Sequence, residues 1–187
     1  MTVIAYKAGK MACDALCVDI DTGTTVSKGS KIKRTKVGAL IGQSGDADSR
    51  AFLALMDTIK CGAKIPTCKE LADTKCEGTF LIAFPTGEVW TIDIYPDKEM
   101  QAWQASACAV TGMHSIAHAG CGGELALAFM RAGKTAREAV ASVCEINAYC
   151  APPIYEEKLR PTIKPIPKLT TSPPNTASQS SKRKARK

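Results

Sequence analysis

The sequence predicts an α+β fold in which helices cover antiparallel sheets. Strand-like runs and helical runs are segregated along the chain, which favours antiparallel sheets over a doubly wound parallel sheet. Neither a GxxxxGK nor a GxGxxG phosphate-binding element occurs, and this disfavours a nucleotide-binding fold. With 187 residues, 45% of them hydrophobic, the chain is long enough for one domain with a substantial core.

The N-terminal region is predicted to consist of paired strands. Val3–Lys7 and Lys10–Asp14 flank the turn signal Ala8-Gly9 and read as a hairpin. Further strands are predicted at Thr24–Val26, Lys31–Thr35 and Val37–Gln43.

The pattern changes to a helical period near Asp46. Apolar residues then recur at i, i+3, i+4 and i+7, which predicts an amphipathic helix from about Ala47 to Lys60 with Phe52, Leu55, Met56 and Ile59 on its buried face. The polar segment that follows, Cys61–Gly78, offers only a short helix around Lys69–Ala72.

A second group of strands follows. Thr79–Phe84 and Glu88–Tyr95 flank Pro85-Thr86-Gly87, a strong hairpin signal. Met113–Ala119 reads as a further strand, and it runs into the glycine-rich segment Gly120–Gly123.

Two helices and a short strand complete the domain. The first helix has Leu125, Ala128, Phe129 and Ala132 on one face, and Gly133 is its stop signal. The second opens with a capping box of Thr135 and Glu138, and Pro152-Pro153 lies at or just after its end. Its predicted apolar face consists of Ala136, Ala139, Val140, Val143 and Cys144.

The charge distribution divides the chain into a domain, residues 1–160, and a basic tail, residues 161–187. The net charge is +7, and the whole excess comes from the residues from Lys164 onward, so the domain itself is formally neutral. This argues against a basic nucleic-acid-binding face on the domain. The Pro/Ser/Lys-rich tail is expected to be disordered. It either serves as a solubilising extension or contacts nucleic acid or an acidic partner.

The nine cysteines are predicted to be reduced. Their number is odd, no CxxC pair occurs, and the start of the chain lacks the basic-then-apolar pattern of a signal peptide. A cytoplasmic protein with packed thiols fits this pattern. No apolar run is long enough to span a membrane, and no metal or other cofactor is expected.

Thr2 is the first candidate functional residue. Thr2 is small, so removal of Met1 is expected to leave a threonine with a free α-amine. Such a residue carries a hydroxyl nucleophile together with its own general base. The α-amine suits that role because its reference pKa of about 7.7–8.0 lies close to neutral pH.

The chain resembles the proteasome β-subunit family, and more closely its bacterial HslV-type relatives and their phage-encoded cousins. The resemblance covers roughly residues 2–155 and rests on the order of several segments rather than on any one of them. These segments are Thr2–Tyr6, Met11–Asp14, Lys28–Ile32, Ile41–Asp48, Phe80–Glu88, and Ala119–Gly123 with the helix after it.

The resemblance implies the four-layer αββα sandwich of N-terminal-nucleophile hydrolases and a threonine-type endopeptidase. Thr2 would be the nucleophile, Lys31 would stabilise its alkoxide, Asp14 would hold Lys31, and the Gly45 N–H would bind the oxyanion. Lys31 is preferred over Lys33 because Ile32 follows it as an apolar residue does in the family. The resemblance also implies a homo-oligomeric ring, polypeptide substrates and an ATPase unfoldase partner.

Three supporting positions depart from the family pattern. Cys121 stands where the family has a serine, Asn147 replaces an aspartate, and Cys150 replaces a hydroxyl residue. Cys121 keeps a weak donor, whereas Asn147 keeps hydrogen bonding but loses the charge. A catalytically impaired structural or assembly subunit of the same fold is therefore the alternative prediction.

Overall fold

We analysed a computed structural model, which describes residues 2–18, 25–45, 49–59, 65–110 and 116–160. Met1, Cys61 and the predicted basic tail lie outside the described residues.

Two antiparallel sheets and a small ribbon hold the strands. The four-stranded sheet has the order β10-β1-β2-β11, and the five-stranded sheet has the order β5-β6-β7-β8-β9. The four-stranded sheet comprises β1 (Ile4–Lys7), β2 (Lys10–Cys13), β10 (Ala117–Ala119) and β11 (Tyr155–Lys158). The five-stranded sheet comprises β5 (Ile32–Arg34), β6 (Leu40–Gly45), β7 (Gly78–Ala83), β8 (Val89–Asp97) and β9 (Ala102–Ala109). The ribbon pairs β3 (Leu16–Val18) with β4 (Thr25–Lys28).

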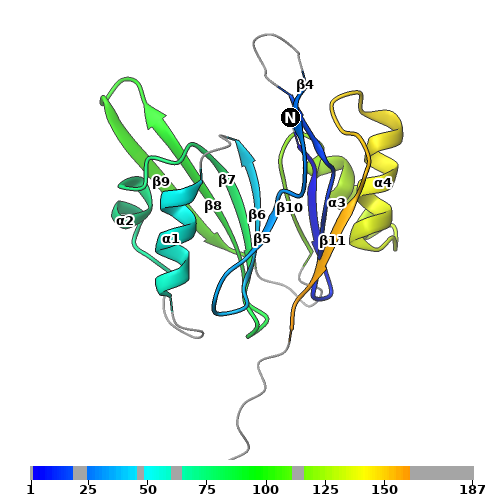
Figure 1. The fold of residues 1–187 in the computed structure, drawn as a ribbon, viewed down its shortest axis with the longest axis horizontal. Helices are drawn as coiled ribbons and strands as arrows, with labels where there is room; N and C mark the ends of the chain where they lie inside the picture. The colour runs from blue at the N-terminus through cyan, green and yellow to red at the C-terminus, as the bar shows by residue number, and fades with distance from the viewer. Residues whose placement is uncertain (1, 19–24, 46–48, 60–64, 111–115, 161–187) are drawn as a thin grey trace, which may run out of the picture.

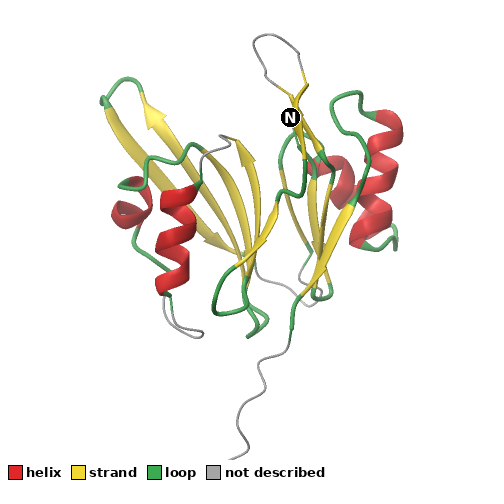
Figure 2. Cartoon of the chain, viewed as in Figure 1, coloured by secondary structure: helices red, strands yellow, loops and turns green. Residues whose placement is uncertain are grey.

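The sheets face each other, and a pair of helices covers the outer face of each. Figures 1 and 2 show α1 (Arg50–Thr58) and α2 (Cys68–Ala72) on the five-stranded sheet. On the other side, α3 (Gly123–Arg131) and α4 (Ala136–Ile146) cover the four-stranded sheet. The order of layers is therefore helix, sheet, sheet, helix, which confirms the predicted αββα sandwich.

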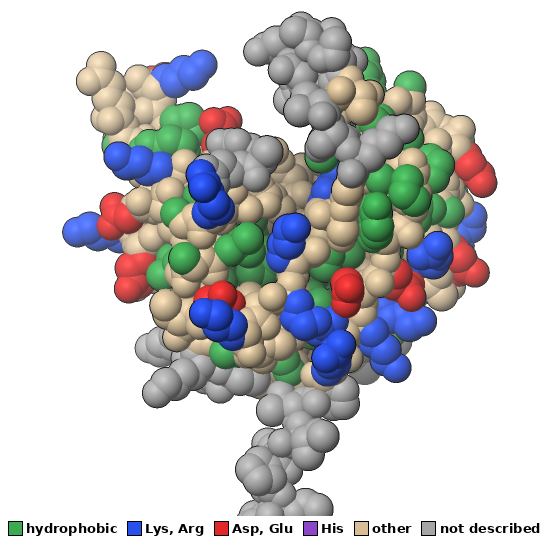
Figure 3. Space-filling view, viewed as in Figure 1, with side chains coloured by type: hydrophobic (Ala, Val, Ile, Leu, Met, Phe, Trp, Pro, Cys, Tyr) green, Lys and Arg blue, Asp and Glu red, His purple; other side chains and the backbone are tan. Residues whose placement is uncertain are grey.

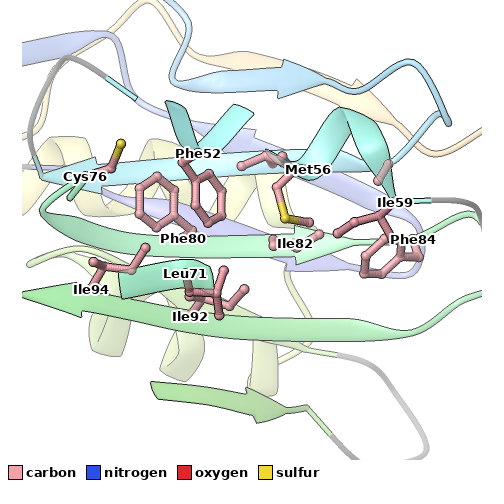
Figure 4. Close-up of a cluster of buried hydrophobic side chains, with 12 residues drawn as sticks. Phe52, Met56, Ile59, Leu71, Cys76, Phe80, Ile82, Phe84, Ile92 and Ile94 are labelled. Carbon is pink, nitrogen blue, oxygen red and sulfur yellow. The ribbon is translucent and has the colours of Figure 1, made fainter. Parts of the chain in front are cut away.

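Each interface between layers has its own core, because successive strand residues point to opposite faces. Phe80 and Ile82 on β7 pack under α1 and α2 (Figure 4), whereas Leu81 faces the second sheet. Val3 and Ala5 face α3 and α4.

The helix signals of the sequence are largely confirmed. Thr135 accepts from the Glu138 N–H, and the Glu138 carboxylate accepts from the Thr135 N–H, which completes the predicted capping box of α4. The same box occurs at α2 between Thr67 and Glu70, where it was not foreseen. Gly133 follows α3 with φ +103°, as a helix stop requires.

Several predicted boundaries and one helix face are wrong. The predicted face of α3 is rotated, because Leu125 is 41% exposed while Ala126 and Met130 are buried. Strand β6 ends at Gly45 rather than Gln43. Residues 35–38 form a turn with Gly38 at φ +87°, so the strand starts later than predicted. Strands β3 and β9 were not predicted at all.

Candidate active site

The β1–β2 hairpin brings Thr2 next to Asp14. Ile4 lies opposite Cys13 in the ladder, so the two residues that precede β1 meet the residue that follows β2. The Val3 N–H donates to Asp14 Oδ1 at 2.9 Å, and the Asp14 N–H donates to the Val3 carbonyl at 3.3 Å. Thr2 is 6% exposed and Asp14 is fully buried. The carboxylate is thus fixed to the backbone beside Thr2.

Lys31 completes a buried ion pair with Asp14. Its Nζ lies 2.8 Å from Asp14 Oδ1, and the side chains are 6% and 0% exposed, respectively. The ammonium also donates to the Leu16 carbonyl, and Asp14 Oδ2 accepts from the Leu16 N–H at 3.2 Å. Lys33, the competing lysine, is exposed on β5. The structure therefore places Lys31, and not Lys33, beside Asp14.

A glycine-rich turn holds the Thr2 carbonyl. The Gly122 N–H donates to it at 3.1 Å, and the Cys121 thiol donates at 3.5 Å. Gly120 has φ +82°, and a Cβ there would overlap the Thr2 carbonyl. A Cβ on Gly122 would lie 2.8 Å from Val3 Cβ. Only glycine permits this close approach of two backbones.

Gly45 ends β6 close to this turn. Ser44, its neighbour, has its Oγ 3.1 Å from the position of a Cβ on Gly120. Gly45 has φ +126°, and a Cβ there would lie 2.7 Å from the Glu77 carbonyl. The close pairing of Gly45 with Gly78 is therefore enough to require a glycine at position 45, independently of any role of the Gly45 N–H.

Three thiols lie near the ion pair. Cys13 Sγ accepts from the Lys31 N–H at 3.4 Å, and Cys150 Sγ lies 3.3 Å from the position of a Cβ on Gly122. Burial, and then the charge of Asp14, raise the pKa of Cys150 to about 12 and that of Cys144 to about 11. Burial also raises the pKa of Cys13. These three groups are therefore neutral thiols rather than thiolates at neutral pH.

Asn147 lies at the end of α4. It caps the C-terminus of α4, where its Oδ1 accepts from the Tyr149 N–H at 3.0 Å and its carbonyl accepts from the Cys150 N–H at 3.0 Å. Within the described residues, no hydrogen bond joins Asn147 to Thr2, Asp14 or Lys31.

The structure thus brings together Thr2, Asp14, Lys31 and Cys121, with Cys150 packed behind them. The sequence predicts Gly120 and Gly122 at a helix start but does not indicate their contact with Thr2, and it gives no signal for Ser44. The Gly120–Gly123 cluster was the available signal. The contact of this cluster with Thr2 joins residues far apart in the sequence, so no local sequence pattern predicts it.

Among the described residues, no group of three or more His, Cys, Asp or Glu side chains could hold a metal ion. No helix in the described part of the chain is long and apolar enough to cross a membrane.

Comparisons with known proteins identify the fold. No family model and no curated protein matches the sequence. Among solved structures, BPH of Thiobacillus denitrificans is similar with a TM-score of 0.54 at 16% identity, over 86% of this chain and 98% of that one. The same protein in complex with epoxomicin gives 0.54 at 17% identity, over 86% and 99%. Eukaryotic HslV from Trypanosoma brucei gives 0.54 at 18% identity, over 83% and 97%. The chain therefore has the fold of HslV-type, proteasome-like proteins.

Proposed function

We propose that the chain is a threonine-type endopeptidase whose nucleophile is Thr2 after removal of Met1. The observation that carries the proposal is the buried Asp14–Lys31 ion pair, which is hydrogen-bonded to Val3, the residue after Thr2. Burying two charges costs free energy of folding, and a well-packed pair of apolar side chains often stabilises a fold equally well. An ammonium held beside a hydroxyl nucleophile has a chemical use, because its charge favours the alkoxide.

In the proposed mechanism, Thr2 Oγ attacks the scissile carbonyl of a polypeptide. The Thr2 α-amine, through a water molecule, accepts the hydroxyl proton and later protonates the leaving amine. The positive charge of Lys31 also disfavours protonation of the Thr2 α-amine, and Asp14 holds Lys31 in place. The Gly45 N–H donates to the developing oxyanion, a contact worth about 3–4 kcal/mol in other hydrolases. Water then releases the acyl group from Thr2.

We also propose an assembly and a location for the peptidase. The likeness to HslV supports a homo-oligomeric ring that acts with an ATPase unfoldase on polypeptide substrates. Every cysteine in the described residues is a free thiol, which agrees with a cytoplasmic location. A phage-encoded origin and contacts of the basic tail with nucleic acid or an acidic partner stay predictions.

Hydrolysis of a fluorogenic peptide by the full chain tests the proposal, after intact-mass measurement has shown that Met1 is absent. Thr2→Ala is expected to lower kcat by about 10⁴-fold or more, as loss of a nucleophile does elsewhere. Thr86→Ala, in the exposed hairpin turn, is the matched control and should leave the rate unchanged. Epoxomicin, which one similar structure contains, should bind the wild type and not Thr2→Ala. Equal hydrolysis by wild type and Thr2→Ala would exclude Thr2 as the nucleophile.

The second candidate is a catalytically impaired structural or assembly subunit. The position of Asn147 favours it, because the side chain caps a turn and supplies no charge to the Thr2 amine. Retention of Met1 on the protein isolated from its own source would establish this candidate, since the amine would then be blocked. A processed N-terminus with Thr2-dependent turnover would rule it out.

A further inference from the structure

Cys121 is an exposed thiol at the candidate active site. Its Sγ donates to the Thr2 carbonyl at 3.5 Å, and the residue is open to solvent. In Figure 3 the surface is hollowed at the top, beside the projecting β8–β9 hairpin, at the end of the molecule where β1 begins in Figure 1. Oxidants in solution attack accessible thiols first. Cys121 is therefore the thiol of this site that a small oxidant reaches.

Cys150 is buried against the same glycine-rich turn. It is 3% exposed, and its Sγ lies 3.3 Å from the position of a Cβ on Gly122. Gly122 follows Cys121 in the chain, and its N–H donates to the same Thr2 carbonyl. The charge of an ionised Cys121 is one of the causes that raise the pKa of Cys150. An exposed thiol and a buried thiol thus lie at adjacent positions of one turn, where Gly122 contributes no side chain.

Cys144 is a third thiol in this region, but it is less suited to react first. It lies on α4 and is half-buried, and burial raises its pKa to about 11. At neutral pH it is almost entirely protonated, whereas the thiolate is the form that reacts with an oxidant. Cys121 is the thiol that combines exposure with a contact to Thr2.

We propose that Cys121 and Cys150 form a reversible disulfide that switches the peptidase off in the presence of a hydroperoxide. The inference rests on the proposed peptidase function and names a regulation of that site. Cys121 Sγ attacks a peroxide oxygen and the O–O bond breaks, which leaves a sulfenic acid on Cys121 and releases an alcohol or water. Cys150 Sγ then attacks the sulfenic sulfur. The S–S bond forms, the S–O bond breaks, and the hydroxyl leaves as water with the proton of Cys150.

The neutral state of Cys150 favours this disulfide once it has formed. Strongly oxidising disulfides are those whose reduced form is stabilised as a thiolate. Burial holds the pKa of Cys150 at about 12, so the reduced pair gains no such stabilisation at neutral pH. A thiolate of high pKa is also a strong nucleophile, and its position beside the turn offsets its small population. The bond should therefore persist until an added dithiol reduces it.

The disulfide would disturb the position of Thr2. Cys121 Sγ must leave the Thr2 carbonyl in order to bond to Cys150. The turn also holds Thr2 through the Gly122 N–H and through the close approach of Gly120 to the Thr2 carbonyl. A displacement of about 1 Å in an active site can cost about 100-fold in rate. Hydrolysis should therefore fall when the turn is pulled toward Cys150.

Treatment of the reduced full-length chain with one equivalent of hydrogen peroxide tests the proposal. Intact-mass measurement should show the loss of two hydrogens, and remaining thiols are alkylated before digestion. Cleavage after Arg137 separates Cys121 from Cys150. Cleavage after Glu145 separates Cys144 from Cys150. The expected product is a peptide pair that links Cys121 to Cys150, with peptide hydrolysis reduced at least about tenfold and restored by dithiothreitol.

Three variants assign the two steps. Cys121→Ser should give no linked peptides, and its hydrolysis rate should be the same before and after peroxide. Cys150→Ser should leave the sulfenic acid on Cys121, where dimedone labels it more strongly than in the wild type. Cys108→Ser is the matched control, because Cys108 is exposed on β9. It should form the same link and lose the same activity as the wild type.

The location of the link and the rate together decide the outcome. Absence of a link, a link from Cys121 to Cys144, or a Cys121–Cys150 link with unchanged hydrolysis would overturn the switch. Absence of Thr2-dependent hydrolysis in the reduced chain would count against the peptidase function instead. In that case the Cys121–Cys150 link, which is measured by mass alone, would still establish the thiol pair as a site of oxidation.

Discussion

The two helix-covered sheets are packed in opposite ways. Under α1 and α2 the core uses large side chains, and the rings of Phe52 and Phe80 stack with centroids 3.8 Å apart (Figure 4). Under α3 and α4 the core uses small ones, with alanines on both strands and both helices. These are Ala5, Ala12, Ala126, Ala136 and Ala139.

The two layers therefore contribute different things. The layer with large side chains contributes more stability, and the layer with small side chains fixes the position of Thr2. Large side chains bury more apolar area, and each buried CH₂ contributes about 0.8 kcal/mol. Small side chains contribute less, but they let backbones approach closely, as at Gly120 and Gly122 against Thr2 and Val3. The layer that carries Thr2 thus gains a fixed geometry in exchange for buried area. It should tolerate added atoms poorly, whereas the opposite layer should tolerate removed atoms poorly.

The largest expected effect is in the large-residue layer. Phe52→Ala should lower the free energy of unfolding by about 3–5 kcal/mol, because it leaves a cavity beside Phe80. The matched truncation in the other layer, Val140→Ala, should cost about 1.5 kcal/mol for two lost methyl groups. Urea denaturation monitored by circular dichroism measures both. Equal losses would show that the two layers contribute alike and would contradict the comparison.

The second effect is in the small-residue layer. Gly120→Ala places a methyl group against the Thr2 carbonyl and should cost about 1–3 kcal/mol from overpacking, in addition to backbone strain. Gly133→Ala is the matched control, because φ is +103° and a Cβ there would meet nothing within 4 Å. It should show the strain alone.

Denaturation midpoints of the two alanine variants give this difference directly. Peptide hydrolysis should be lost with Gly120→Ala and kept with Gly133→Ala. Identical stability and activity of the two would show that the Gly120 turn yields easily, and the tight contact with Thr2 would then have no mechanical role.

Local signals explain how much of this fold the sequence could predict. The β1–β2 hairpin, the box at Thr135 and the stop at Gly133 each follow from residues within one turn of the element. Asp14 and Lys31 were paired through the family resemblance, and the structure places them 2.8 Å apart. Nothing in the intervening sequence encodes that distance.

Strand β9 and the face of α3 were missed for a shared reason. Trp103 is the only large side chain that β9 sends toward the core, and its other inward residues, Ala105 and Ala107, give almost no hydrophobic alternation. In α3 the buried face contains Ala126 rather than the larger Leu125. Hydrophobicity ranks the larger residue as buried. Close packing against β1 selects the smaller one, and that contact is visible only in three dimensions.

The smallest expected effect is a loss of stability at high pH that comes from the thiols of the same layer. Burial holds the pKa of Cys150 at about 12 in the folded chain, against about 8.5 in an unfolded one. Above pH 8.5 the unfolded state has therefore lost a proton that the folded state retains. The stability falls as the pH rises toward 12.

Between pH 8 and 10 the contribution of Cys150 to this loss should be about 2 kcal/mol. Cys150→Ala removes the titrating group. The unfolding free energy of this variant should therefore fall less between pH 8 and 10 than that of the wild type, whatever the variant's stability at pH 8. Cys108→Ala is the control, because Cys108 is exposed on β9 and its removal should leave the pH profile unchanged. Urea denaturation at several pH values measures all three profiles.

Alkylation by iodoacetamide at pH 8.5 gives an independent measurement of burial, since Cys108 should react well before Cys150. Early modification of Cys150 would mean that the layer opens readily around Thr2, and the contrast in rigidity between the two layers would then be wrong.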